Sequence, residues 1–209
     1  MLVTRPVDQA EPLASRLREA GHEPILCPLI AIEPLRNEPI DLDRYDWLIV
    51  TSANGAAELG RRARGQPTRI AAVGEATAAA LASVGLGADL VPETSTQDGL
   101  LAALPRPAGR VLVAAAEEAR PLLAEELAAD VISLYRTRAL RPSAVPPADV
   151  VVLASGSAAR AFAALGVDLP AVSIGPQTTA AAQAAGVRVV AEASTQDVDG
   201  LVAAVAAAL

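Results

Sequence analysis

Short apolar runs alternate along this chain with segments in which apolar residues recur every three or four positions. Apolar runs of this kind are typical of strands buried on both faces, and the second pattern is typical of amphipathic helices. The predicted strands are Leu2–Thr4, Trp47–Thr51, Ile70–Val73, Val111–Ala114, Val150–Ala154 and Val172–Ile174. The alternation of strands and helices predicts parallel sheets covered by helices on both faces.

The first helical segment illustrates how the helices are expected to face the sheet and to end. Its inward face is predicted to hold Ala10, Leu13, Ala14 and Leu17. A glycine follows it, and glycine ends helices because it adopts the left-handed backbone at low cost. The glycines expected to end helices are Gly21, Gly85, Gly166 and Gly186.

The chain contains the same plan twice. The phrase STQDGLLAAL at 95–104 returns as STQDVDGLVAAV at 194–205. Three pairs of segments correspond: 2–29 with 111–135, 47–60 with 151–164, and 70–104 with 172–205. We therefore expect an α/β fold with two flavodoxin-like or Rossmann-like parallel-sheet domains.

Polar residues gather in the loops that follow the predicted strands. In parallel sheets ligands bind beyond the carboxyl ends of the strands, where free backbone N–H groups at helix starts attract anions. The loops contain, in chain order, Arg5, Ser52, Asn54, Gly74, Thr77, Thr96, Ser155, Ser157, Gly175 and Thr178. Serine and threonine at such places also serve as simple helix caps. Both interpretations remain open for any single residue, but the recurrence in both halves favours a shared ligand cleft between two domains.

Composition narrows the chemistry. Aromatic residues make up 2% of the chain, so small and branched aliphatic side chains must build the cores. A net charge of -7 argues against a nucleic-acid partner, which is held mainly through phosphate neutralisation. A single cysteine, Cys27, and a single histidine, His22, argue against disulfides, most metal sites and histidine-based triads. The turns at Gly74–Thr77 and Gly175–Thr178 lack the glycine spacing of a nucleotide-binding loop, so the sequence does not support a nucleotide site.

The chain carries no apolar stretch of about 18 residues, so no membrane span and no membrane partner are expected. The amino terminus, MLVTRPVDQ, enters a strand-like run at once, and no signal peptide is expected.

Several short motifs in fixed order resemble one known family. They are VTRP at the start, VTSANG, AVGEATAAAL, YRT, SIGPQTTAAA and the DGL of the last helix. Together, and over nearly the whole chain, they resemble uroporphyrinogen-III synthase. The resemblance implies a cytoplasmic, cofactor-free lyase of porphyrin biosynthesis. It would cyclise hydroxymethylbilane to uroporphyrinogen III with inversion of the terminal pyrrole ring and loss of water.

The same resemblance implies a domain arrangement and partners. One discontinuous domain would comprise 1–34 plus 141–209, a second would comprise 36–138, and two extended linkers would lie near 30–36 and 135–142. The substrate would be a linear tetrapyrrole, handed over in one scenario from hydroxymethylbilane synthase. A monomer is the expected state.

The family's site residues carry over to particular positions of this chain. Tyr135 matches the tyrosine of the Tyr-x-Thr motif and becomes the catalytic candidate, whose phenol would assist departure of the substrate hydroxyl. The matching substrate-binding positions are Ser52, Asn54, Thr77, Ser155, Ser157 and Thr178. The chain departs from the family's pattern at Ala114–Glu117 and at Ala154, and we assign no substrate contact to either.

Two other functions remain open at this stage. One is a two-domain protein that closes on a small anionic ligand without chemistry, using the same loops. The other is a synthase-like regulatory module without activity, which the departure at Ala114–Glu117 makes conceivable. Catalytic turnover separates both from the enzyme.

Overall fold

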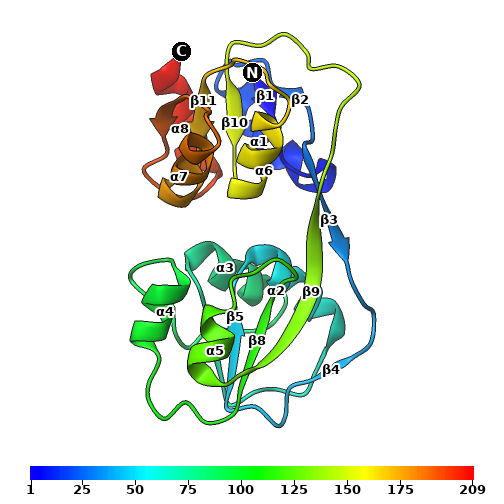
Figure 1. The fold of residues 1–209 in the computed structure, drawn as a ribbon, viewed down its shortest axis with the longest axis vertical. Helices are drawn as coiled ribbons and strands as arrows, with labels where there is room; N and C mark the ends of the chain where they lie inside the picture. The colour runs from blue at the N-terminus through cyan, green and yellow to red at the C-terminus, as the bar shows by residue number, and fades with distance from the viewer. The chain divides into compact units, whose positions relative to one another are not determined.

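The computed structural model describes every residue, 1–209, and the chain forms two compact units (Figure 1). Unit 1 comprises Met1–Ala31 and Arg138–Leu209, and unit 2 comprises Ile32–Thr137. The chain passes from one unit to the other within two strands, β3 (Ile30–Pro34) and β9 (Asp130–Ala139). These strands are neighbours in one sheet.

Unit 1 is built on a five-stranded sheet in the order β12-β11-β10-β1-β2, and all its neighbouring strands are parallel. Its elements are β1 (Leu2–Val3), α1 (Val7–Glu19), β2 (Ile25–Leu26), β10 (Val151–Leu153), α6 (Gly156–Ala163), β11 (Ala171–Ser173), α7 (Pro176–Ala184), β12 (Val189–Glu192) and α8 (Val198–Ala208).

Unit 2 is built on a second five-stranded sheet, in the order β3-β9-β8-β5-β7, and on a two-stranded parallel sheet of β4 and β6. The remaining elements are β4 (Ile40–Asp41), β5 (Trp47–Val50), α2 (Ala53–Arg62), β6 (Ala63–Arg64), β7 (Arg69–Ala72), α3 (Glu75–Ser83), α4 (Gln97–Ala103), β8 (Val111–Ala116) and α5 (Leu122–Leu127).

The two large sheets share one strand order. Segments that correspond in sequence take equivalent places: β9-β8-β5-β7 in unit 2 matches β2-β1-β10-β11 in unit 1. The match extends to the edge, where Leu90 bridges Ala71 of β7 in parallel, as β12 pairs with β11. Numbered along unit 1, this order is 2-1-3-4-5, which is that of flavodoxin-like folds. The predicted α/β fold with two such sheets is confirmed.

In unit 1, helices cover both faces of the sheet (Figure 1). On one face, α1 and α8 bury Leu13 and Leu201 in the same cluster as Val3 of β1. On the other, α6 and α7 bury Phe162 and Ala182. The predicted inward face of α1 is confirmed, since its four buried residues are Ala10, Leu13, Ala14 and Leu17.

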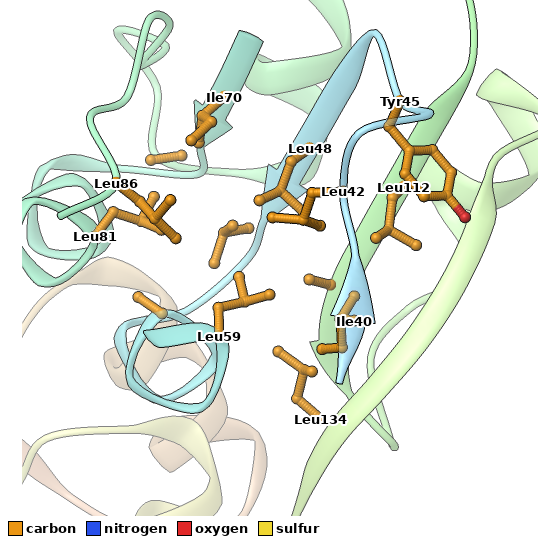
Figure 2. Packing of buried hydrophobic residues seen from close by; sticks show 14 of the residues in the cluster. Ile40, Leu42, Tyr45, Leu48, Leu59, Ile70, Leu81, Leu86, Leu112 and Leu134 are labelled. Carbon is orange, nitrogen blue, oxygen red and sulfur yellow. The ribbon is translucent and has the colours of Figure 1, made fainter. Parts of the chain in front are cut away.

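In unit 2, the core between the sheet and helices α2 and α3 consists mainly of aliphatic side chains (Figure 2). Leu48 and Leu112 project from the sheet toward Leu59 of α2 and Leu81 of α3. Helices α4 and α5 cover the other face with Leu100 and Leu123. Fully buried side chains of this size each contribute about 1.5–3 kcal/mol, so this packing is the main stabilising contribution.

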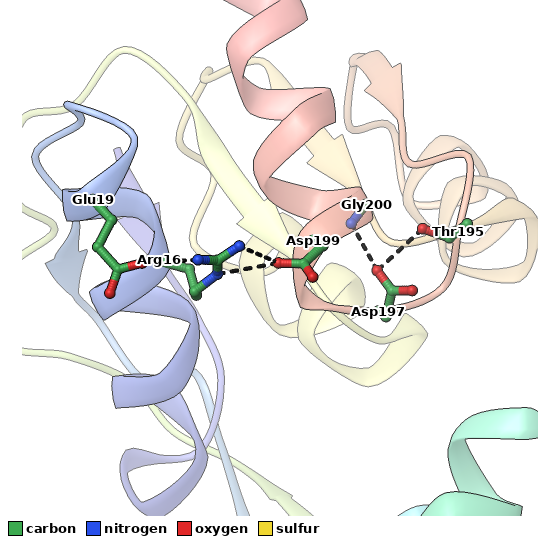
Figure 3. Close-up of polar contacts among 6 residues, drawn as sticks. All are labelled: Arg16, Glu19, Thr195, Asp197, Asp199 and Gly200. Atoms are coloured by element: carbon green, nitrogen blue, oxygen red, sulfur yellow. Dashed lines mark hydrogen bonds and ion pairs between the residues drawn. The ribbon is translucent and has the colours of Figure 1, made fainter.

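Helix termini in both units follow the local chemistry of the sequence. The four predicted stop glycines have φ values between +67° and +83°. At the start of α8, the Asp197 carboxylate accepts a hydrogen bond from Gly200 N at 2.7 Å (Figure 3). On the surface, Arg16 of α1 pairs with Asp199 of α8 at 2.8 Å and so connects two neighbouring helices (Figure 3).

Candidate functional site

The strand order of each sheet defines where a ligand site is expected. In doubly wound sheets ligands bind beyond the carboxyl ends of the two central strands from which the chain winds in opposite directions. In unit 1 these strands are β1 and β10, which lead into Arg5 and Ser155. In unit 2 they are β8 and β5, and β5 leads into Ser52. Each unit thus presents polar loop residues at its own switch point.

In unit 2 the switch point brings together three residues that the sequence analysis singled out. The hydroxyl oxygen of Tyr135, on β9, lies 2.8 Å from Oγ of Ser52, in the loop after β5. The side chain of Asn54 also hydrogen-bonds to the Tyr135 hydroxyl. Tyr135 is 5% exposed, so its phenol is held in a defined position by packing and by two polar partners.

The environment of Tyr135 favours the protonated phenol. Burial raises the pKa of Tyr135 above its ordinary value, and the hydrogen bonds from Ser52 and Asn54 offset this in part. The negative charge of Glu118 raises the same pKa further. The phenol is therefore neutral near pH 7 and available as a hydrogen-bond donor.

Helix capping accounts for part of what the loop residues do. The Ser52 hydroxyl accepts from Gly55 N at 3.0 Å at the start of α2, and Ser155 accepts from Ala158 N at 3.2 Å at the start of α6. Thr96 caps α4 in the same way through Gly99 N at 2.9 Å. Ser52 alone among these three combines the cap with a contact to Tyr135.

The glycine turns after β7 and β11 are equivalent in the two units. Gly74 and Gly175 have extended backbones, and each starts a helix without a side-chain cap. A Cβ on Gly74 would lie 2.6 Å from Oγ of Ser95, and one on Gly175 would lie 2.9 Å from Cγ of Gln196. Ser95 leaves no room for a side chain at Gly74, whereas the exposed Gln196 side chain could shift away from one at Gly175.

The threonines of the two turns, Thr77 in α3 and Thr178 in α7, occupy the same helical position and are both buried. Their backbone N–H groups bond to Gly74 O and Gly175 O, both at 3.0 Å. Because both side chains are buried, both threonines contribute to packing within their own unit.

Arg5 follows β1 at the switch point of unit 1. The preceding residue, Thr4, is fully buried and donates to Val152 O at 2.8 Å, which fixes this loop to β10. Burial lowers the pKa of Arg5, and no carboxylate contributes to that shift. A half-buried guanidinium without an acidic partner can bind a ligand carboxylate.

Two polar groups near these loops were missed by the sequence analysis. Glu118 accepts from Thr137 N at 3.3 Å and acts on Tyr135 through its charge. In unit 1, Ser173 lies 2.5 Å from Thr179, whose hydroxyl also bonds to Glu192. Ser173 is the last residue of the apolar strand β11, and a polar residue at a strand end is a signal by which the sequence could have identified it. Nothing in the sequence signalled Glu118.

The chain contains no group of three or more His, Cys, Asp or Glu side chains arranged to hold a metal ion. No helix is long and apolar enough to cross a membrane. Within each unit, the candidate loops therefore offer hydroxyls and helix starts, with Arg5 added in unit 1 and Asn54 and Tyr135 added in unit 2.

These features define a class: a two-unit α/β protein with flavodoxin-like sheets and hydroxyl-rich loops at the sheet switch points. A family model described as Uroporphyrinogen-III synthase HemD matches residues 11–203. The chain is 31% identical to a uroporphyrinogen-III synthase of Synechococcus elongatus, over 98% of this chain and 93% of that protein. It belongs to the uroporphyrinogen-III synthase family.

Two further comparisons agree. A putative uroporphyrinogen-III synthase of Methanocaldococcus jannaschii is 29% identical over 66% of this chain, and the match spans 61% of that protein's length. A crystal structure of a mutant uroporphyrinogen III synthase from Thermus thermophilus superposes with a TM-score of 0.65 at 17% identity. That superposition covers 99% of this chain and 97% of the other, and it supports the fold.

Proposed function

We propose that this chain is a uroporphyrinogen-III synthase: a cofactor-independent lyase that cyclises hydroxymethylbilane, inverts the terminal pyrrole ring and releases water. Membership of the family, with a full-length relative of that name, supports the activity. The observation that carries the assignment in the structure is the neutral, positioned phenol of Tyr135 beside Ser52.

The proposed reaction needs little from the protein beyond positioning and one proton donor. Departure of the substrate hydroxyl leaves a cation stabilised by the pyrrole nitrogen. The substituted carbon of the terminal ring attacks that cation to give a spiro intermediate, which fragments and recloses at the other carbon beside the ring nitrogen. Loss of a proton from that carbon restores the pyrrole, so that hydroxide and proton together leave as water. The Tyr135 phenol hydrogen-bonds to the leaving oxygen, and its protonated state at neutral pH suits this role.

Substrate binding is proposed to use the loops at both switch points. Arg5, Ser155, Ser157, Gly175 and Thr178 are the candidates of unit 1. The candidates of unit 2 are Ser52, Asn54, Gly74, Thr77 and Thr96. Helix starts and an arginine without an acidic partner bind carboxylates locally, even in a chain of net charge -7.

The remaining proposals concern organisation. We regard 1–34 plus 141–209 and 36–138 as the two domains, with linkers near 30–36 and 135–142. We also propose a cytoplasmic monomer that receives its substrate from hydroxymethylbilane synthase.

The experiment that tests the activity supplies freshly generated hydroxymethylbilane to the purified protein without added metal or cofactor. The products are oxidised, and the type I and type III uroporphyrins are separated. Predominance of type III is the expected result. Formation of type I alone, the product of spontaneous closure, would contradict the synthase activity and favour a ligand-binding or regulatory role.

A further inference from the structure

Unit 2 contains a buried arginine whose hydrogen-bonding capacity is not satisfied. Arg62, the last residue of α2, is 3% exposed. Its Nε donates to Glu38 O at 3.0 Å, whereas Nη1 is buried and has no hydrogen-bond partner in the chain. A buried guanidinium without a carboxylate is unfavourable, because burial removes its water and the one hydrogen bond to Glu38 O replaces only part of it.

This arginine lines a surface pocket of about 700 Å³ that lies wholly within unit 2. Leu35, Pro39 and Val131 supply apolar walls, and Ser133 adds a hydroxyl. Val131 is 55% exposed, so its apolar side chain is open to solvent. The pocket therefore combines a cationic group with apolar walls that are open to solvent.

The charges around the pocket differ in burial. Arg36, Glu38 and Glu117 also line it, but all three side chains belong to exposed residues. Exposed charges are screened by water and salt, whereas a buried charge is screened much less. The charge of Arg62 is therefore screened less than the other three, and the residual negative charge of Glu38 and Glu117 disfavours a doubly charged anion.

We propose that this pocket binds a small organic carboxylate. Its single negative charge pairs with the Arg62 guanidinium, and its apolar body packs against Leu35, Pro39 and Val131. Neither Tyr135 nor Ser52 lines the pocket, so this site is additional to the proposed catalytic one. Its walls come from residues that follow β3 and from β9, the two strands in which the chain passes between units.

The test uses benzoate as the probe, with neutral benzamide and inorganic phosphate as comparators. Calorimetry on the full chain measures affinity, and arginine side-chain NMR on ¹⁵N-arginine-labelled protein follows the Arg62 Nε–H signal. Saturable binding of benzoate with a shift of that signal is expected, with benzamide and phosphate at least about tenfold weaker. Equal affinity for benzamide and benzoate would overturn the proposal.

Two substitutions distinguish the contribution of Arg62 from that of the adjacent Arg61. Arg62→Met is expected to weaken benzoate binding at least about tenfold. The matched control, Arg61→Met, removes an exposed arginine that pairs with Glu58 outside the pocket and leaves the affinity within about twofold. Unchanged affinity in folded Arg62→Met would contradict the proposal.

A second pair of variants does not touch the buried arginine, in case Arg62→Met fails to fold. Val131→Glu places a negative charge at the exposed wall and should weaken benzoate binding about three- to tenfold relative to the neutral Val131→Gln. Equal affinities of the two variants would count against an anion site.

Competition with uroporphyrin I then identifies the source of the carboxylate. Displacement of benzoate would assign the pocket to a side chain of a tetrapyrrole, and simultaneous binding would assign it to a separate small carboxylate. Both results support the site. These readouts do not use turnover, so failure of this proposal is distinguishable from failure of the proposed function.

Discussion

The Tyr135 hydroxyl lies 2.8 Å from Oγ of Ser52, which joins β9 to the loop after β5 across 83 positions of sequence. Ser52 already accepts a hydrogen bond from Gly55 N at 3.0 Å. Either hydroxyl can donate in the contact between Ser52 and Tyr135, and when Ser52 is the donor the phenol proton can point toward a ligand. Ser52 therefore both positions the Tyr135 hydroxyl and caps the start of α2.

Substitution Tyr135→Phe is expected to lower kcat about 10- to 100-fold, because a phenyl ring fills the same space but cannot donate to the leaving hydroxyl. KM should change little. Measurement of type III product over time gives both constants, and unchanged thermal unfolding serves as the control for folding. Retention of full kcat would remove Tyr135 from the mechanism.

Alkaline pH is expected to destabilise the protein through its tyrosines. Burial raises the pKa of Tyr135 in the folded state above the ordinary value of about 10. At a pH between the ordinary pKa of the unfolded state and the raised pKa of the folded state, the folded state binds more protons than the unfolded state. The free energy of unfolding therefore falls as pH rises through this range. The stabilising contribution is complete below about pH 10 and is lost as pH rises through the folded-state pKa.

Urea denaturation from about pH 8 to about pH 11 measures this loss. Tyr135→Phe should reduce the steepness with which the free energy of unfolding falls above about pH 10. Tyr45, whose pKa is raised by burial and by its bond to Asp130, and Cys27, whose thiol pKa is raised by burial, also contribute to the loss of stability, and Tyr45→Phe is the matched control. A slope independent of both tyrosines would contradict this account.

The substitution Gly74→Ala should destabilise the protein by about 1–3 kcal/mol, because the added Cβ overlaps a packed loop. It would lie 2.6 Å from Oγ and 2.9 Å from Cβ of Ser95. Urea denaturation measures the change, and addition of Ser95→Gly should recover part of it. Gly87→Ala is the control, since its Cβ meets nothing within 4 Å. Equal effects at both glycines would refute the steric explanation.

The start of α8 offers a comparison of two neighbouring aspartates (Figure 3). Asp197→Ala removes the acceptor for Gly200 N and should cost about 1 kcal/mol of stability. Asp199→Ala breaks an exposed ion pair with Arg16 and should leave the urea midpoint almost unchanged, because exposed pairs are screened. A larger effect at Asp199 than at Asp197 would reverse this ranking.

Local patterns predicted most of the fold. The six apolar runs form strands within one or two residues of their expected ends, and the four stop glycines follow helices as expected. The correspondence between the two halves reappears as a common strand order. These features follow from hydrophobic periodicity and backbone preference, which act over a few residues.

Other elements depended on distant partners. The strand β9 runs through Arg136 and Arg138, in the segment near 135–142 where the family resemblance implied an extended linker. It continues because β3 lies beside it, with Glu33 and Arg136 paired at 3.5 Å. The small sheet of β4 and β6 was not predicted, since strands of two residues leave no periodic signal.

The amino-acid sequence by itself determined the two-sheet α/β plan, the helix ends and the polar loops after the strands, because each rests on local chemistry. It also determined family membership, through motifs spread over the chain. Only the tertiary structure decided which polar residues meet. The contact between Ser52 and Tyr135 and the unpaired state of buried Arg62 arise from packing between distant segments, and burial is a property of the assembled core.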